Sequence, residues 1–248
     1  MNFLKKLFGS VEVTSEEEKK NQQAKDFDVL KYDGVAALKQ NAPDYAIKCF
    51  THALELRDDG ETRDYLVQAL IRTNNLTAAY KQLELLARLE PNNKRVWLCM
   101  ADVAYMMEDY QAMTDACEKA NEIDSEDVYV NYTHAKACIG REDFVNGIAL
   151  LTKAVNLSED SPLWEARLLR GQTLLKMGDA ESAEHDADYM LEHIGEHEDV
   201  LMLKARCLEA RDDNDNALVY YGKVIDTNPF CLDALRARAA LRELMGDT

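Results

Sequence analysis

Residues 216–229 read NALVYYGKVIDTNP, and residues 78–91 read AAYKQLELLARLEP. In both stretches an alanine near the start is followed four residues later by a bulky residue and twelve residues later by proline. These residues are Ala217, Tyr221 and Pro229 in the first stretch, and Ala79, Leu83 and Pro91 in the second. If the pattern comes from a repeat, it must recur at a fixed period along the chain.

A period close to 34 residues connects the two stretches. Small or slim residues recur in steps of 33, 34, 34, 36 and 34 residues at Ala46, Ala79, Met113, Gly147, Ala183 and Ala217. Twelve residues before each of them, a second series consists of Gly34, Val67, Ala101, Ala135, Gly171 and Ala205. Four residues after each of them, a third series consists of Phe50, Leu83, Cys117, Leu151, Ala187 and Tyr221. A recurrence of this kind predicts a stack of equivalent units, in which the residues of each series occupy equivalent places.

The pattern resembles the tetratricopeptide repeat, a unit of two antiparallel helices that we call helix A and helix B. In that family, small residues lie where helices A and B cross, and proline often follows helix B. The resemblance covers about residues 27–248. It implies an all-α fold, a right-handed α-solenoid of six helical hairpins closed by a C-terminal capping helix.

The registers divide the chain into a short lead-in and a repeat array. Residues 1–26 form the lead-in, in which SEEEKKNQQAK (15–25) has no apolar stripe and is either a helical turn or a flexible tail. The repeats are expected near residues 27–59, 60–93, 94–127, 128–161, 164–197 and 198–231, and the capping helix at 232–246. The stretch SEDSPLW lengthens the step into the fifth repeat. It is either a longer turn or a point that divides the array.

Composition narrows the possible partners. The net charge of −17 repels phosphate, so nucleic acid is excluded as an expected partner of the main body. The six cysteines form no C-x-x-C pair, and no apolar run is long enough to span a bilayer. We therefore expect a cytoplasmic protein with reduced cysteines.

The sequence contains few motifs that are typical of catalysis, cofactor binding or metal binding. The sequence contains no phosphate-binding, dinucleotide-binding or nucleophile-elbow motif, so neither a cofactor nor an enzymatic activity is expected. One alternative is a metal site formed by His185, His193 and His197, since HIGEH places two histidines four residues apart. A further alternative is a membrane-peripheral scaffold tethered by the amphipathic N-terminus, where apolar residues of MNFLKKLF fall on one helical face. In the fifth repeat, Arg170 and Asp186 occupy positions that often form an ion pair within the unit.

The resemblance implies where a partner would bind. In such solenoids helix A lines the concave surface, and the family's lining positions can be transferred residue by residue. The expected partner-binding groove consists of Tyr32, Tyr65, Gln68, Arg72, Arg95, Leu98, Asp102, Tyr105, Tyr129, Tyr132, Lys136, Gln172, Lys176 and Arg206. Tyrosines are good anchors for a peptide, and the interspersed basic residues favour a segment with apolar and acidic side chains. The sequence thus predicts an adaptor or scaffold that binds an unidentified protein or peptide, and it does not indicate an oligomeric state.

Overall fold

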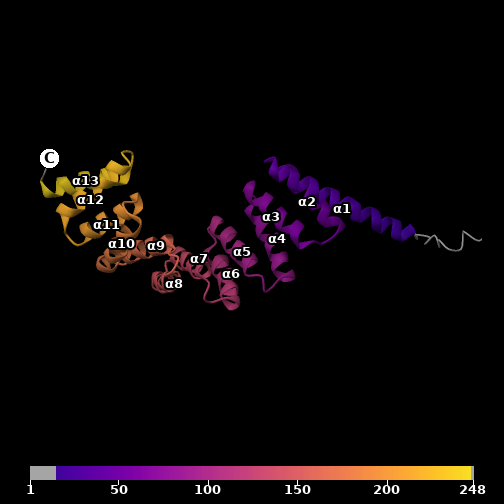
Figure 1. Ribbon diagram of the computed structural model, residues 1–248, viewed down its shortest axis with the longest axis horizontal. Coiled ribbons are helices and arrows are strands. Elements are labelled where there is room, and N and C mark those ends of the chain that lie inside the picture. Colours follow the sequence, from indigo (N-terminus) through magenta and orange to yellow (C-terminus); the bar gives the residue numbers. More distant parts are fainter. Residues whose placement is uncertain (1–14, 247–248) are drawn as a thin grey trace, which may run out of the picture. The chain divides into compact units, whose positions relative to one another are not determined.

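The computed structural model describes residues 15–246 of the 248-residue chain. Within that range the chain is all-α, with helices joined by short connections and no strand (Figure 1). The helices are α1 (Ser15–Lys39), α2 (Pro43–Leu56), α3 (Gly60–Arg72), α4 (Leu76–Leu89), α5 (Lys94–Met106), α6 (Tyr110–Ile123), α7 (Val128–Gly140), α8 (Phe144–Leu157), α9 (Trp164–Lys176), α10 (Ala180–Ile194), α11 (Glu198–Ala210), α12 (Asn214–Thr227) and α13 (Leu232–Met245). The odd-numbered helices α1 to α11 correspond to helices A, and the even-numbered helices to helices B.

The chain divides into two compact units. One ends at Met107 and contains α1 to α5, and the other begins at Glu108 and contains α6 to α13. The long connection SEDSPLW lies inside the second unit, between α8 and α9, so the division does not fall there. Ser158 ties this connection together, because its Oγ accepts a hydrogen bond from the Leu163 amide at 3.3 Å and donates one to the Val155 carbonyl at 3.2 Å.

Each turn from helix A into helix B uses the same backbone device. The second residue after helix A has a left-handed conformation, with φ between 56° and 87°, at Asn41, Asn74, Glu108, Glu142, Gly178 and Asp212. In the last four of these turns the next residue is an aspartate that caps helix B: its side chain accepts a backbone N–H from the first turn of α6, α8, α10 or α12. The left-handed residue stops helix A, and the aspartate starts helix B.

Small residues allow the paired helices to approach closely. Gly34 in α1 faces Phe50 in α2, and a Cβ atom at Gly34 would lie 2.4 Å from the Phe50 ring. Gly171 in α9 allows a close contact with the next helix A, because a Cβ atom there would lie 2.7 Å from a methyl group of Leu203 in α11. In all three periodic series, every residue is buried. The period read from the sequence therefore follows the helix–helix contacts.

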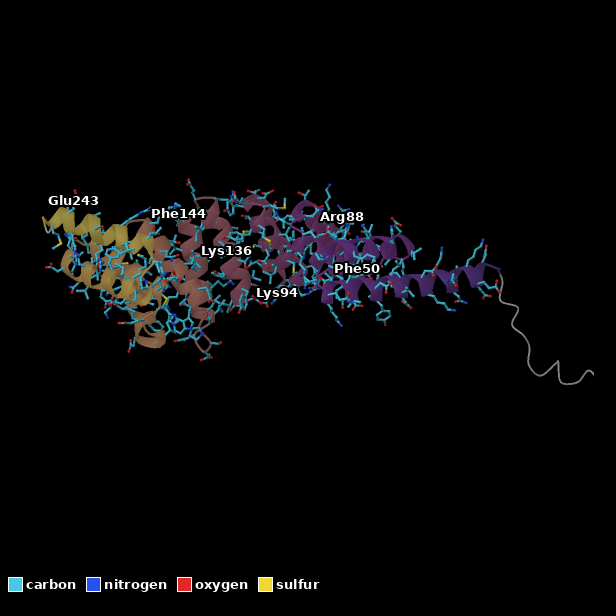
Figure 2. All side chains as sticks on the ribbon, turned by 90° about the horizontal axis from the view of Figure 1, so that it is seen from above. Phe50, Arg88, Lys94, Lys136, Phe144 and Glu243 are labelled. Atoms are coloured by element: carbon cyan, nitrogen blue, oxygen red, sulfur yellow. The ribbon has the colours of Figure 1, made fainter. Side chains whose placement is uncertain are left out.

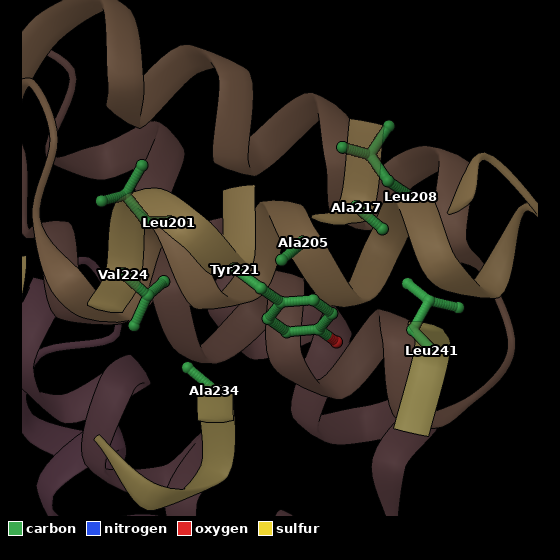
Figure 3. Close-up of a cluster of buried hydrophobic side chains, with 8 residues drawn as sticks. All are labelled: Leu201, Ala205, Leu208, Ala217, Tyr221, Val224, Ala234 and Leu241. Carbon is green, nitrogen blue, oxygen red and sulfur yellow. The ribbon is translucent and has the colours of Figure 1, made fainter. Parts of the chain in front are cut away.

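In the second unit the core includes local clusters, each built from neighbouring helices. The cluster at the end of the second unit joins α11, α12 and α13, and Figure 3 shows the Tyr221 ring of α12 between Ala205 and Ala234. The Tyr221 hydroxyl donates a hydrogen bond to Glu209. Burial, together with this acceptor, raises the pKa of Tyr221 well above its ordinary value. A tyrosine thus fills the core at the bulky position and has a partner for its polar end.

Helix α1 is longer than the sequence pattern indicated. It begins at Ser15 and continues without interruption to Lys39, so residues 15–25 are helical. The side chains of residues 16–25 are exposed, and the first turns of α1 stand clear of other helices (Figure 2). Glu, Lys, Gln and Ala favour helix even without packing, and this segment continues a helix that is anchored further on by Phe27.

Candidate functional site

The candidate site in the first unit consists of side chains on helices A. Tyr32 of α1 and Tyr105 of α5 are 73% and 42% exposed, and both offer aromatic area to a partner. Tyr65 of α3 is half-buried instead, because its ring stacks on Phe50 with the centroids 5.7 Å apart. Its hydroxyl is 3.3 Å from Glu61, and the negative charge of that carboxylate raises the pKa of Tyr65. Two of the three predicted tyrosines here are therefore open, and the third also supports the core.

The predicted polar residues of this unit are engaged with other groups of the chain. Arg95 donates to Asp64 at 3.0 Å, and Gln68 donates to the same carboxylate at 3.2 Å. Arg72 donates to the Leu38 carbonyl of α1 at 2.9 Å. The hydrogen bonds of Arg72 and Arg95 link successive helices A, so these two residues help to order the repeats, whereas that of Gln68 stays within α3.

Two further predicted residues lie on α5. Leu98 is half-buried and Asp102 is exposed. Together with Tyr105 they follow one another at intervals of three or four residues, which places them on the same stripe of the helix.

A pair of lysine–aromatic contacts forms part of the candidate site in the second unit. Tyr129 of α7 is 61% exposed, whereas Tyr132 is half-buried. The Lys136 ammonium lies 5.8 Å from the centroid of the Tyr132 ring, and the Lys176 ammonium lies 4.4 Å from that of Phe144. In both cases an aromatic ring of the same unit attracts the lysine ammonium and orients the side chain.

The structure brings Gln172 and Arg206 together at one pocket. Its volume is about 250 Å³, and it is lined by Gln172, Leu175, Glu198, Asp199, Met202, Leu203, Arg206, Cys231 and Asp233. Sequence reasoning missed its carboxylates. A signal was present for Asp199, because it occupies the second residue of the sixth repeat, which is one of the lining positions of helix A. Asp233 has the same place in the capping helix.

The histidines proposed as an alternative metal site do not assemble. Among the residues that the structure describes, no group of three or more His, Cys, Asp or Glu side chains could hold a metal ion. His193 stacks on Tyr189 with the ring centroids 4.0 Å apart, and its Nδ1 lies 2.7 Å from the Tyr189 carbonyl. His197 is the residue that precedes α11, and His185 lines a different pocket beside Arg170 and Asp186.

The ion pair expected in the fifth repeat is present. Arg170 binds Asp186 through two hydrogen bonds, of 2.9 and 2.6 Å, and Arg167 adds a third of 3.1 Å. Asp186 is only 1% exposed, so its charge is compensated by both guanidinium groups. The pair joins helices α9 and α10.

The residues suggested as a membrane tether, 1–8, lie outside the described part of the chain. Within the described part, no helix combines the length and the apolar character that crossing a bilayer requires.

Comparison with solved structures identifies proteins of similar architecture. The chain is similar to YrrB, described as a TPR (tetratricopeptide-repeat) protein with an unusual peptide-binding site, with a TM-score of 0.63, 23% identity, and coverage of 77% of this chain and 97% of YrrB. It is also similar to PilW, a widely conserved type IV pilus biogenesis factor, with a TM-score of 0.66, 18% identity, and coverage of 76% and 87%. For PilF from Pseudomonas aeruginosa the TM-score is 0.66 at 16% identity, with coverage of 88% and 99%. No family model and no curated protein matches the sequence significantly. At these identities the likeness concerns the fold.

Proposed function

We propose, from the tetratricopeptide-repeat fold of the chain, that this protein is a non-enzymatic scaffold that binds a partner polypeptide in the concave groove lined by helices A. The observation that supports this most directly is the exposure of Tyr32, Tyr105 and Tyr129, all on helices A. A large aromatic side chain left open to water is typical of an interaction surface, and tyrosine is frequent among the residues that dominate binding energy.

A capture experiment tests the proposal. The full chain is immobilised and exposed to a lysate of its source, and captured proteins are quantified by mass spectrometry for the wild type and for Tyr32→Ala/Tyr129→Ala. Removing two anchor residues is expected to lower capture of the specific partner by roughly tenfold or more. Tyr65 is left intact, since its ring stacks on Phe50 and its removal would also disturb the core.

The matched control is Tyr45→Ala. Tyr45 is 56% exposed, comparable to Tyr129, but it lies on the helix B α2. Retained capture by Tyr45→Ala together with loss by the double variant supports binding at helices A. Equal capture by all three proteins, or equal loss by both variants, contradicts it.

A further inference from the structure

The pocket of about 250 Å³ in the second unit has two chemically distinct parts. Leu175 of α9 with Met202 and Leu203 of α11 gives it an apolar floor, and Leu203 is buried. Charged groups of α11 and α13 form its rim. The volume lies below the range of about 300–1,000 Å³ that is typical of small-molecule sites, so the pocket suits one long side chain.

The rim is acidic. It holds the carboxylates of Glu198, Asp199 and Asp233 and a single guanidinium, that of Arg206. Three negative groups against one positive group leave a formal excess of two negative charges. The basic residues of the predicted groove indicated a partner with acidic side chains. The negative charge of this rim favours a positively charged group instead.

The chain itself neutralises the three carboxylates only in part. Arg206 lies 3.8 Å from Asp233, in a loose pair whose two side chains are both more than half exposed. Glu198 accepts hydrogen bonds from the Asn228 amide at 3.0 Å on both oxygens, which holds it in place without cancelling its charge. The Asp199 side chain has no hydrogen bond or ion pair within the described chain.

We propose that this acidic pocket binds a single lysine or arginine side chain of the partner polypeptide, an inference that rests on the proposed function. The aliphatic stem would lie on the floor made by Leu175, Met202 and Leu203, and the cation would meet Asp199 and Asp233. Long basic side chains combine an apolar stem with a charged end, so they match a pocket with an apolar floor and an acidic rim. A bare metal ion does not fit the same description, because no metal-binding group is found among the described side chains.

Synthetic peptide libraries provide the test. Three libraries of short capped peptides are prepared in which one central residue is fixed as lysine, glutamate or leucine and all other positions are mixed. Each is passed over the immobilised full chain, and retained peptides are quantified. The lysine library is expected to be retained roughly fivefold more than the glutamate library, since two partly exposed ion pairs together contribute about 1 kcal/mol.

Two variants locate the effect. Asp199→Asn/Asp233→Asn is expected to remove the preference for lysine, whereas Asp44→Asn/Asp215→Asn is expected to keep it. Asp44 and Asp215 are exposed aspartates in the first turns of α2 and α12 and do not line the pocket, so this control matches the loss of two negative charges and the helix position. Melting curves check that both variants remain folded.

The outcomes separate this inference from the proposed function. Retention of no library above a blank support would refute the binding of polypeptides, and the pocket assignment with it. Retention of the glutamate library above the lysine library, lost in Arg206→Gln, would leave the scaffold function in place and overturn the basic-side-chain assignment. A lysine preference that survives Asp199→Asn/Asp233→Asn would also overturn it.

Discussion

At the scale of single residues, the turns within the hairpins share one conformation but not one residue type. The left-handed position is occupied by asparagine, glutamate, glycine or aspartate, and all six of these residues are exposed. Because these exposed side chains do not pack in the core, the residue type at this position can vary while the backbone conformation stays the same. Asn, Asp and Gly are the residue types that most readily adopt this conformation, whereas the sequence alone could not show that a glutamate adopts it at positions 108 and 142.

Replacing the glycine at one of these turns tests the effect of backbone strain on stability. Gly178→Ala is expected to lower the free energy of unfolding by about 1 kcal/mol, because an alanine at φ 87° is strained. No atom lies within 4 Å of a Cβ at Gly178, so crowding does not contribute. Chemical denaturation of the purified variant measures the effect.

Gly222→Ala is the matched control. Gly222 lies in the middle of α12, and a Cβ there also meets no atom within 4 Å. Alanine favours a helix interior over glycine, so this change should raise the free energy of unfolding by about 0.5–1 kcal/mol. The same substitution is thus expected to have opposite signs at the two sites, and equal signs would show that the turn is not strained.

The candidate site was only partly predictable at this scale. Exposed Tyr32 and Tyr129 could be assigned from their places in helix A, since the lining stripe follows from the period. The sequence could not predict that Arg72 binds the Leu38 carbonyl or that Arg95 binds Asp64, because these hydrogen bonds join different helices. The acidic pocket depends on α9, α11 and α13 meeting at one place, which a single helix does not show.

At the scale of helices, Asp59 both starts α3 and joins it to α1. Its carboxylate accepts hydrogen bonds from the Thr62 amide at 2.9 Å, the Thr62 hydroxyl at 2.6 Å and the Lys31 ammonium at 3.0 Å. Partial burial alone would raise the pKa of Asp59, but these donors outweigh it and lower the pKa to about 2. The charged carboxylate is therefore favoured in the folded chain.

The depressed pKa predicts how stability depends on pH. Because the folded pKa lies below the ordinary value of 3.8, the contribution is complete above about pH 4 and is lost as the pH falls towards 2. Asp59→Asn keeps a capping residue but removes the charge, and it should lower the free energy of unfolding at pH 7 by on the order of 1 kcal/mol. The difference from the wild type should shrink below about pH 3. Urea titrations at several pH values measure it.

Asp28→Asn serves as the control for this pH dependence. Asp28 is exposed in the middle of α1 and has no ion pair or side-chain hydrogen bond within the described residues. Its replacement should change stability little at any pH. A difference for Asp59→Asn that stays constant from pH 7 to pH 2 would contradict the linkage.

At the scale of the whole molecule, the prediction of the tetratricopeptide-repeat fold is confirmed. It succeeded because the crossing of two helices tolerates only slim side chains at fixed intervals, as Gly34 and Gly171 show. The early start of α1 was not predictable, since residues 15–25 have no apolar stripe and depend on helix propensity. The boundary between the two units, after Met107, was not predictable either, because the spacing of the repeats is regular there.

Stability in such a fold should be local, because each helix contacts mainly its neighbours in the chain. The buried Asp186 tests this idea in the second unit. Asp186→Ala leaves Arg167 and Arg170 without their shared carboxylate, and both side chains remain largely buried. Breaking a buried ion pair in this way is expected to cost about 3 kcal/mol.

Hydrogen exchange measured by mass spectrometry resolves where that cost appears. Amides of α9 and α10, and then those of the adjoining α8 and α11, should exchange faster in Asp186→Ala, while α2 and α3 of the first unit keep the protection of the wild type. Asp188→Ala on the same helix is the control, since Asp188 is more than half exposed and its pair with Lys204 should contribute less than about 1 kcal/mol. An equal loss of protection in both units would mean that the chain unfolds as one cooperative body, and local stability would have to be abandoned for this protein.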